Sequence, residues 1–293
     1  MLVVIGGPTG VGKSDLAVKL AKSIDGEIIS ADSMQIYKGF DIGTAKITAD
    51  EMQGVAHYMI DCVDGKQSFT VSDYKTIVKP LIDDILSRGK TPILVGGTGL
   101  YIDAVLHPFQ FGTFSPRIRD KYNKLAEKLG AEGLYALLND KSPSVASSIH
   151  PNNVKRVIRA LEILEGGGNY TEDKHINEYE YMYIVLSMDR EALYNRVELR
   201  IDKMIGAGLM QEVDNLRKEI PWDSQAMQAI GYKEWRAYFD NEATLDEVVA
   251  KIKINTRHYV KKQLTWFRAK KEAVWFDVSR RDEIIQYVKD RLK

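Results

Sequence analysis

The first residues that could do chemistry lie near the N-terminus, where the chain reads G-P-T-G-V-G-K-S. This segment matches the phosphate-binding pattern G-x-x-x-x-G-K-[ST] at every defined position. Glycines let successive backbone N–H groups turn toward one phosphate, while the lysine adds a positive charge and the last hydroxyl can reach Mg²⁺. The sequence therefore predicts a diphosphate or triphosphate site, although a glycine-rich turn that merely joins a strand to a helix is the alternative. The residues of this loop are Gly7, Pro8, Thr9, Gly10, Val11, Gly12, Lys13 and Ser14, with Ser14 the candidate Mg²⁺ ligand.

Acidic residues near this loop would decide what the bound phosphate is used for. A P-loop nucleotidase or kinase is expected to carry a carboxylate at the end of a neighbouring apolar strand, where it orders the metal-bound water. Here the apolar run at 91–95 is followed by Gly-Gly-Thr, which ends in Thr98. The carboxylate in a comparable position is Asp32, after the run at 27–31. Asp32 can be the metal-side acid, can serve other chemistry, or can simply cap the following turn, and spacing leaves these roles open.

Positive charge gathers near the C-terminus. The chain has 41 basic and 41 acidic residues, yet residues 251–271 contain no acidic residue. A basic segment without acids suits contact with RNA phosphates, and a solvated helix face is the alternative. The aromatic residues Tyr259, Trp266 and Phe267 are expected to pack in the core more often than to stack on bases. The basic residues of this segment are Lys251, Lys253, Arg257, Lys261, Lys262, Arg268, Lys270 and Lys271.

The pattern of apolar runs predicts the elements that position these groups. Strands are expected at 2–5, 27–30 and 91–95, and helices at 13–24 and 71–87. This alternation predicts an α/β fold of the P-loop NTPase type, in which helices flank both faces of a parallel sheet.

The strand pattern stops at about residue 114 and returns at residue 181. Between these positions we expect a helical insertion domain at 114–180, and we assign 1–113 and 181–293 to the P-loop α/β core with its C-terminal helices. The insertion is expected to hold helices at 117–129, 131–138 and 153–164. The returning core is expected to hold strands at 181–186 and 274–278 and helices at 191–205, 209–218 and 244–268.

The amino-acid composition limits the classes of protein to which this chain can belong. The chain has 293 residues, of which 44% are hydrophobic and 28% charged, so it is globular and not disordered. One cysteine, Cys62, excludes an internal disulfide framework, and we expect it to be a small buried residue. No apolar run approaches the roughly 18 residues of a membrane span, so we expect a soluble cytoplasmic protein. No oligomerisation element is evident, and a monomer is the default expectation.

Several further motifs appear in a fixed order along nearly the whole chain, and together with the P-loop they resemble the tRNA dimethylallyltransferases, also called tRNA isopentenyltransferases. The motifs are I-S-A-D-S-M-Q-I-Y at 29–37, D-I-G-T-A-K at 41–46, G-G-T-G-L-Y at 96–101, H-P-N-N-V-K-R-V-I-R-A-L-E at 150–162, G-L-M-Q-E-V at 208–213, Q-A-I-G-Y at 228–232 and Q-L-T-W-F-R at 263–268.

This resemblance implies a reaction. A dimethylallyl group would pass from dimethylallyl diphosphate to the exocyclic N6 of adenine 37 in tRNA, beside the anticodon, and diphosphate would be released. The P-loop would then hold a leaving diphosphate, whose charge Lys13 and Mg²⁺ would neutralise. Asp32 matches the family's general base, and Thr98 matches a threonine beside the reacting centre that contacts the substrate.

The resemblance also implies where tRNA binds. Ser33, Met34 and Gln35 match the segment that contacts the extruded target base, although Gln35 can instead bond locally. The family pattern in the insertion usually begins with Gln-Arg, and this chain has Lys155 in place of the glutamine. Gln228 stands where many relatives carry a basic residue. The tRNA-binding residues assigned on these grounds are Asp32, Ser33, Met34, Gln35, Thr98, Arg119, Lys155, Arg156, Arg159, Arg257 and Lys262.

Two other classes of protein remain as alternatives. An ATP-dependent kinase of a small molecule or nucleoside would use the same P-loop, with Arg156 and Arg159 as a phosphate-clamping lid. The missing carboxylate after the strand at 91–95 and the acid-free basic segment argue against it. A non-catalytic RNA-binding protein could use phosphate as a ligand switch, but Asp32 and Thr98 beside the loop argue against that interpretation.

Overall fold

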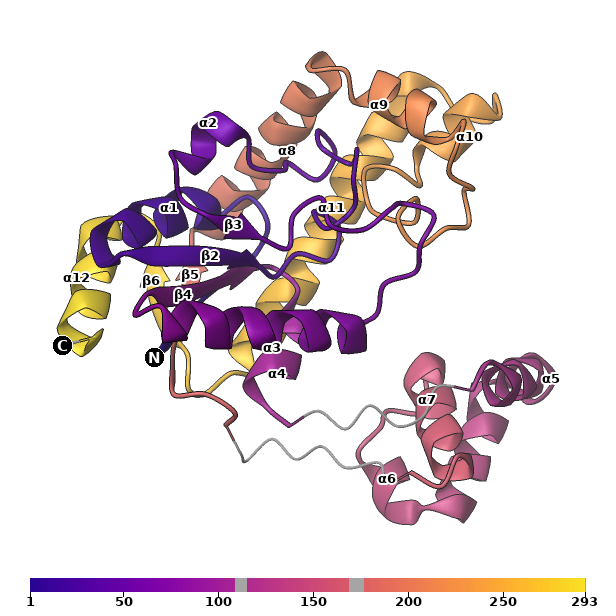
Figure 1. Ribbon diagram of the computed structural model, residues 1–293. Coiled ribbons are helices and arrows are strands. Elements are labelled where there is room, and N and C mark those ends of the chain that lie inside the picture. Colours follow the sequence, from indigo (N-terminus) through magenta and orange to yellow (C-terminus); the bar gives the residue numbers. More distant parts are fainter. Residues whose placement is uncertain (109–114, 169–176, 293) are drawn as a thin grey trace. The chain divides into compact units, whose positions relative to one another are not determined.

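The computed structural model describes residues 1–108, 115–168 and 177–292, and it divides into two compact units (Figure 1). The larger unit comprises residues 1–106 and 178–293, and the smaller comprises residues 107–177. The domain border that we predicted at 113–114 lies outside the described residues.

The larger unit is built on a six-stranded sheet with the strand order β3-β2-β4-β1-β5-β6. Every pair of neighbouring strands is parallel, which confirms the predicted α/β fold with a parallel sheet. The two-residue strand β3 was not expected, because so short an edge strand has no periodic pattern. The strands are β1 (Leu2–Gly6), β2 (Gly26–Ser30), β3 (His57–Tyr58), β4 (Thr91–Gly96), β5 (Tyr181–Ser187) and β6 (Val274–Asp277).

Helices cover both faces of this sheet, and Figure 1 shows α1 and α3 on opposite sides of it. Two of the long helices begin at a threonine whose side chain forms a capping box, Thr70 for α3 and Thr244 for α11, so local chemistry fixes where they start. The helices of the larger unit are α1 (Lys13–Ile24), α2 (Ala49–Met52), α3 (Val71–Ser87), α4 (Gly99–Leu106), α8 (Arg190–Gly206), α9 (Leu209–Leu216), α10 (Trp235–Phe239), α11 (Leu245–Arg268) and α12 (Arg281–Leu292).

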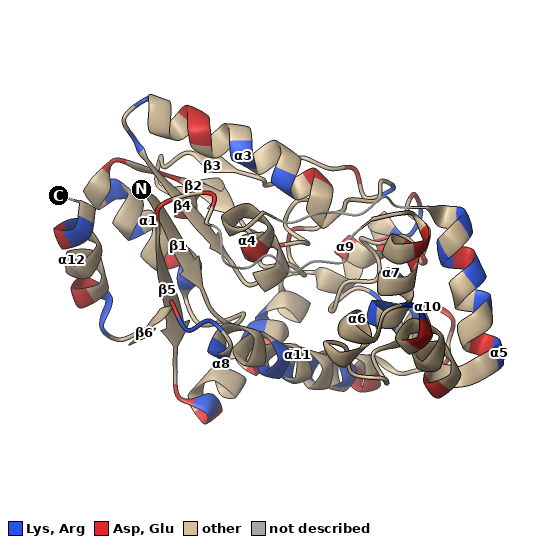
Figure 2. Cartoon of the chain, turned by 90° about the horizontal axis from the view of Figure 1, so that it is seen from below, with Lys and Arg blue, Asp and Glu red and all other residues tan. Residues whose placement is uncertain are grey.

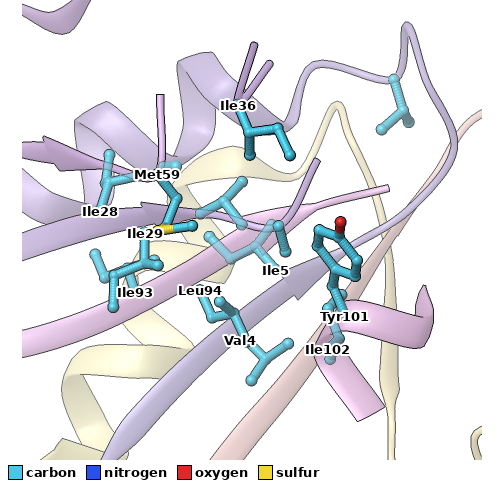
Figure 3. Close-up of a cluster of buried hydrophobic side chains, with 14 of the residues drawn as sticks. Val4, Ile5, Ile28, Ile29, Ile36, Met59, Ile93, Leu94, Tyr101 and Ile102 are labelled. Carbon is cyan, nitrogen blue, oxygen red and sulfur yellow. The ribbon is translucent and has the colours of Figure 1, made fainter. Parts of the chain in front are cut away.

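The core of the larger unit lies on both faces of the central strands. Figure 3 shows Val4 and Ile5 of β1 with Ile28 and Ile29 of β2 and Leu94 of β4 among its buried side chains. Strands of a parallel sheet that are covered on both faces are expected to be apolar at every position, which is why these runs do not alternate.

The end of β4 lies unusually close to the end of β2. A Cβ atom at Gly96 would lie 2.0 Å from the carbonyl oxygen of Ala31, so a residue with a side chain does not fit there. The backbone N–H of Thr98 in turn donates to the same Ala31 carbonyl at 3.1 Å. The glycine therefore lets the segment after β4 approach the segment that begins with Asp32.

The smaller unit is helical, with α5 (Pro116–Lys141), α6 (Pro143–Ser147) and α7 (Val154–Glu165). Gly130 has a φ of 70° and interrupts α5, as expected from the two separate helices predicted at 117–129 and 131–138. Tyr122, Leu134, Leu138 and Leu161 form part of its own buried core, so this unit does not depend on the sheet for its hydrophobic interior.

The structure tests the expected burial of Cys62 and the expected lack of a membrane-spanning helix. Cys62 is exposed, so its predicted burial is wrong: it lies in the connection between β3 and α3, outside the apolar strands that fill the core. Within the described part of the chain, no helix is long and apolar enough to cross a membrane.

Candidate active site

Three loops meet at the carboxyl edge of the sheet. The P-loop follows β1, the segment ending in Thr98 follows β4, and Asp32 follows β2. Because these strands are parallel and adjacent in the order β2-β4-β1, the residues after them lie at one edge of the sheet. The predicted phosphate site and the two candidate catalytic residues are thus brought together.

The P-loop curls around the ammonium group of Lys13. Gly10 and Gly12 have φ values of 82° and 103°, a backbone conformation that favours glycine. Lys13 Nζ donates to the carbonyl oxygens of Gly7 and Pro8 at 2.9 and 2.8 Å. Burial lowers the pKa of Lys13 to about 8, and Asp32 offsets this only in part. The loop therefore carries a positive charge that a bound anion would stabilise.

A second cation, Arg200 of α8, reaches the same loop. Its Nη2 donates to Thr9 Oγ1 at 2.7 Å, while its buried Nε has no hydrogen-bond partner among the described residues. Burial lowers the pKa of Arg200, and the nearby charge of Asp32 opposes this shift. Arg200 could not be predicted as a site residue from the sequence. It lies 191 residues from Thr9, and α8 contains no motif that indicates a phosphate contact.

Asp32 uses one carboxylate oxygen to hold the turn that follows it. Asp32 Oδ1 accepts from the backbone N–H of Met34 at 2.9 Å and from that of Gln35 at 3.4 Å. Asp32 Oδ2 accepts no hydrogen bond from residues 1–108, 115–168 or 177–292. Holding the turn therefore occupies one oxygen of Asp32 and leaves the other available for a chemical role.

Thr98 ties the end of β4 to the segment after Asp32. Its Oγ1 accepts from the backbone N–H of Ser33 at 3.0 Å and donates to Ser33 Oγ at 3.3 Å. Thr98 immediately precedes α4, so its position is set by both a helix start and a cross-loop hydrogen bond.

The inward face of α11 closes this site. Gln263 is 5% exposed, and its side-chain amide accepts from the backbone N–H of Thr9 at 2.9 Å and donates to the carbonyl of Gly97 at 3.0 Å. The hydroxyl of Tyr259 lies close to the side chains of Thr98 and Gln263, and burial raises the pKa of Tyr259 to about 12. We expected Tyr259 to be a core residue, but its hydroxyl is part of the polar site, and sequence analysis assigned no site role to Gln263.

Most of the predicted basic segment lies on α11, whose Lys and Arg residues are blue in Figure 2, and its last two lysines follow that helix. Lys253 pairs with Asp202 of α8 at 2.6 Å, and Arg257 pairs with Glu198 of the same helix. Lys261 and Lys262 are exposed and make no ion pair with any residue that the structure describes. The unbalanced part of the segment therefore includes Lys261 and Lys262, whereas Lys270, after the helix, pairs with Asp103 of α4 at 2.5 Å.

In the smaller unit, two of the predicted tRNA-binding arginines meet at one acid. Arg119 Nη2 and Arg159 Nη1 donate to Glu162 Oε2 at 2.9 and 2.8 Å, and the Glu162 side chain is fully buried. Burial alone would raise the pKa of Glu162, but the hydrogen bonds from Arg159, the Ser115 N–H and Arg119 outweigh it and lower that pKa. Lys155 is exposed on α7, and the backbone N–H of Arg156 bonds the Asn153 cap of this helix.

No metal cluster is formed by the described side chains alone. Among them, no group of three His, Cys, Asp or Glu residues could hold an ion. Ser14, at the start of α1, presents an exposed side chain beside Lys13. A magnesium ion at this site would thus take most of its oxygen ligands from a phosphate ligand and water, as Mg²⁺ commonly does.

The P-loop joins the first strand of the parallel sheet, β1, to the first helix, α1. This arrangement defines a P-loop phosphate-binding α/β protein. The chain belongs to the IPP transferase family, whose sequence profile it matches over residues 35–270. It is 49% identical to the tRNA dimethylallyltransferase of Bacillus subtilis over 95% of this chain and 91% of the relative. It is 47% identical to that of Bacillus cytotoxicus over 100% of this chain and 96% of the relative.

The fold of this chain is also similar to solved structures of such transferases. The tRNA isopentenylpyrophosphate transferase of Bacillus halodurans is similar with a TM-score of 0.77 and 43% identity, and the alignment covers 99% of this chain and 96% of that one. A eukaryotic dimethylallyltransferase acting on tRNA is similar with a TM-score of 0.80 and 29% identity, over 94% of this chain and 73% of that one. These comparisons confirm the family resemblance and give the kinase alternative no support.

Proposed function

We propose that this protein transfers the dimethylallyl group of dimethylallyl diphosphate to N6 of adenine 37 in tRNA. The observation that carries the proposal is the juxtaposition, at one sheet edge, of a cationic P-loop with a carboxylate oxygen that has no partner among the described residues. The first group suits a leaving diphosphate and the second suits a proton acceptor. Membership of the IPP transferase family supports the choice of donor and acceptor.

The donor would bind through its diphosphate. Backbone N–H groups of residues 10–14, at the start of α1, would provide dipoles for the diphosphate, and Lys13 and Arg200 would provide charge where the leaving group becomes more negative. Mg²⁺, held by Ser14 and diphosphate oxygens, would supply further neutralisation of that charge.

In the transfer step, the allylic C–O bond of the donor breaks and its electron pair leaves with the diphosphate. The N6 nitrogen forms the new C–N bond and loses a proton to Asp32 Oδ2. Asp32 is held for this role by its other oxygen, through the N–H groups of Met34 and Gln35. Thr98 and Tyr259 line the same site and would orient the reacting groups.

The acceptor base must leave its stack to reach this site, since N6 is otherwise enclosed by neighbouring bases. Ser33, Met34 and Gln35 lie directly after Asp32 and would contact the extruded base. The insertion, predicted at 114–180, would contact the tRNA as a second surface. Its proposed contacts are Arg119, Lys155, Arg156 and Arg159, and those of α11 are Arg257 and Lys262.

A direct test is to incubate the purified protein with dimethylallyl diphosphate, labelled in its allyl group, and unmodified tRNA. We expect label in the tRNA, and we expect Asp32→Asn to lower turnover about 10²–10⁴-fold with little change in tRNA affinity, the range for loss of a positioned base. Asp50→Asn, at an exposed position of α2, is the matched control and should leave turnover unchanged.

Two results would contradict this proposal. A normal single-turnover rate for Asp32→Asn would remove Asp32 from the chemistry. Transfer of the γ-phosphate of ATP to a small molecule, without prenyl transfer to tRNA, would replace the proposed activity with that of a kinase.

A further inference from the structure

One carboxylate outside the catalytic edge makes an unusual set of hydrogen bonds. Glu212 of α9 accepts from three consecutive backbone N–H groups, those of Asp41, Ile42 and Gly43, at 3.2, 2.7 and 3.1 Å. These amides belong to residues 33–46, which we call the acceptor loop because the loop begins with the residues proposed to contact the acceptor base. Hydrogen bonds to an ionised carboxylate are about twice as strong as neutral ones.

A fourth donor completes the set around Glu212. The fully buried Tyr232 donates its hydroxyl to Glu212 Oε1 at 2.6 Å, and burial together with the Glu212 charge raises the pKa of Tyr232. Glu212 and Tyr232 come from motifs at 208–213 and 228–232, neither of which the proposed transfer step uses. Their shared function is to hold the middle of the acceptor loop.

The acceptor loop is also closed on itself by Lys46. Its Nζ donates to the carbonyl of Tyr37 at 2.8 Å and to Asp41 Oδ1 at 2.6 Å, and the Lys46 side chain is only 5% exposed. The two ends of the segment 37–46 are therefore linked to each other and to the amides that Glu212 holds.

Gln35 is attached to this same segment. Its Nε2 lies 3.4 Å from the carbonyl oxygens of both Thr44 and Ala45, as a donor to each. A continuous series of contacts thus runs from Glu212, through the backbone of 41–45, to the side-chain amide of Gln35.

We propose that Glu212 is a positioning residue for the acceptor base: it fixes the acceptor loop so that Gln35 is correctly placed beside Asp32. This inference rests on the proposed function for the identity of the acceptor. It predicts that Glu212 controls use of tRNA and has no influence on binding of the diphosphate, because none of its hydrogen-bond donors among the described residues belongs to the P-loop.

The test variant is Glu212→Gln, which keeps the size of the side chain but replaces a charged acceptor with an amide. We expect kcat/KM for tRNA, at saturating dimethylallyl diphosphate, to fall about 10-fold or more. The affinity for inorganic diphosphate, measured by calorimetry, should stay within about twofold of the original value. Asp214→Asn, on the same helix, is the control with the same charge change; Asp214 pairs with Arg217 and Lys218, and it should leave both values unchanged.

A double-mutant cycle tests whether Glu212 acts through Gln35. If it does, Glu212→Gln combined with Gln35→Ala will lower kcat/KM for tRNA no further than Gln35→Ala alone, whereas independent sites would give multiplied losses. Should Glu212→Gln fail to fold, Tyr232→Phe removes one of the four donors and is expected to give a smaller loss in the same direction.

The outcomes separate this inference from the proposed function. A parallel fall in diphosphate affinity and tRNA use would show a general structural role and overturn the inference. Multiplied losses in the cycle, or an effect of Glu212→Gln where Gln35→Ala has none, would also overturn it. The proposed function would remain intact in each case, because none of these outcomes bears on whether the unaltered protein transfers label to tRNA.

Discussion

Two groups of cations, one at the P-loop and one in the smaller unit, differ in what neutralises them. Lys13 and Arg200 are drawn out of water at the P-loop, and their hydrogen bonds go to two carbonyl oxygens and a threonine hydroxyl. Arg119 and Arg159 in the smaller unit both donate to the buried carboxylate of Glu162.

This difference distinguishes a site built for a ligand from a site built for the fold. Burying a cation without an ionic partner costs free energy, which is why the pKa values of Lys13 and Arg200 are lowered. An anionic ligand would recover that cost, and such perturbed groups gather at functional sites. The arginines around Glu162 already have their anion, which joins the start of α5 to α7, so part of their role is structural.

Of the changes that test this comparison of cations, the largest effect should come from removing the P-loop charge. Lys13→Ala is expected to slow prenyl transfer about 10²–10³-fold and to weaken diphosphate binding, since the charge acts where leaving-group charge develops. Lys19→Ala, at an exposed site on the same helix, is the control. Donor affinity and transfer rate that both survive Lys13→Ala would mean that the P-loop is not the donor site.

The pH dependence of diphosphate binding identifies Lys13 more specifically. Its pKa is about 8 without an anionic ligand, and a bound diphosphate must raise that pKa because it stabilises the charged form. Affinity should therefore be highest below pH 8 and fall as pH rises above it, by at most tenfold per unit. Calorimetry between pH 7 and 9 should show this decline in the unaltered protein and not in Lys13→Ala.

A smaller effect is expected in the smaller unit, where Arg119 and Arg159 share one buried carboxylate. Glu162→Gln removes the buried carboxylate that Arg119 and Arg159 share and should lower the free energy of unfolding by about 1–3 kcal/mol. Asp120→Asn, which breaks an exposed pair with Lys124 in the same unit, should leave the free energy of unfolding nearly unchanged. Denaturant unfolding, with hydrogen exchange followed in residues 115–168, measures both. If Glu162→Gln left stability unchanged while weakening diphosphate binding, the contrast between the two groups would be wrong.

The parts of this contrast that the sequence could predict are local. The P-loop is one continuous motif, and Asp32 and Thr98 each directly follow an apolar run that was recognised as a strand. The bounds of α1 and α3 could be predicted because their apolar periodicity is strong and α3 begins at a capping threonine.

The parts that the sequence could not predict depend on contacts between distant residues. Arg200 and Gln263 bond Thr9 across 191 and 254 residues, and which face of α8 or α11 meets the P-loop is decided by packing. The same holds for Glu212, whose motif was recognised but whose partners at 41–43 were not. The basic segment could be predicted from its charge pattern. The ion pairs with α8, which neutralise some of its cations and not others, are visible only in the structure.

The smallest effect concerns the basic residues of α11, where balanced and unbalanced cations lie on one helix. Each cation that binds a phosphate releases counterions, so the slope of log K for tRNA binding against log salt should become shallower by about 0.7–0.9 for each such cation removed. Lys261→Gln with Lys262→Gln should therefore flatten the slope, because these exposed side chains have no ionic partner among the described residues.

The control for this measurement is Lys253→Gln with Arg257→Gln, which removes the same charge from positions that α8 already neutralises. A cation that must leave Asp202 or Glu198 before it meets a phosphate gains less from binding, so this pair should flatten the slope less than Lys261 and Lys262 do. Equal slopes for the two pairs would show that α8 does not shield Lys253 and Arg257. An unchanged slope for Lys261→Gln with Lys262→Gln would make that face of α11 a solvated surface and leave tRNA docking to the acceptor loop and the smaller unit.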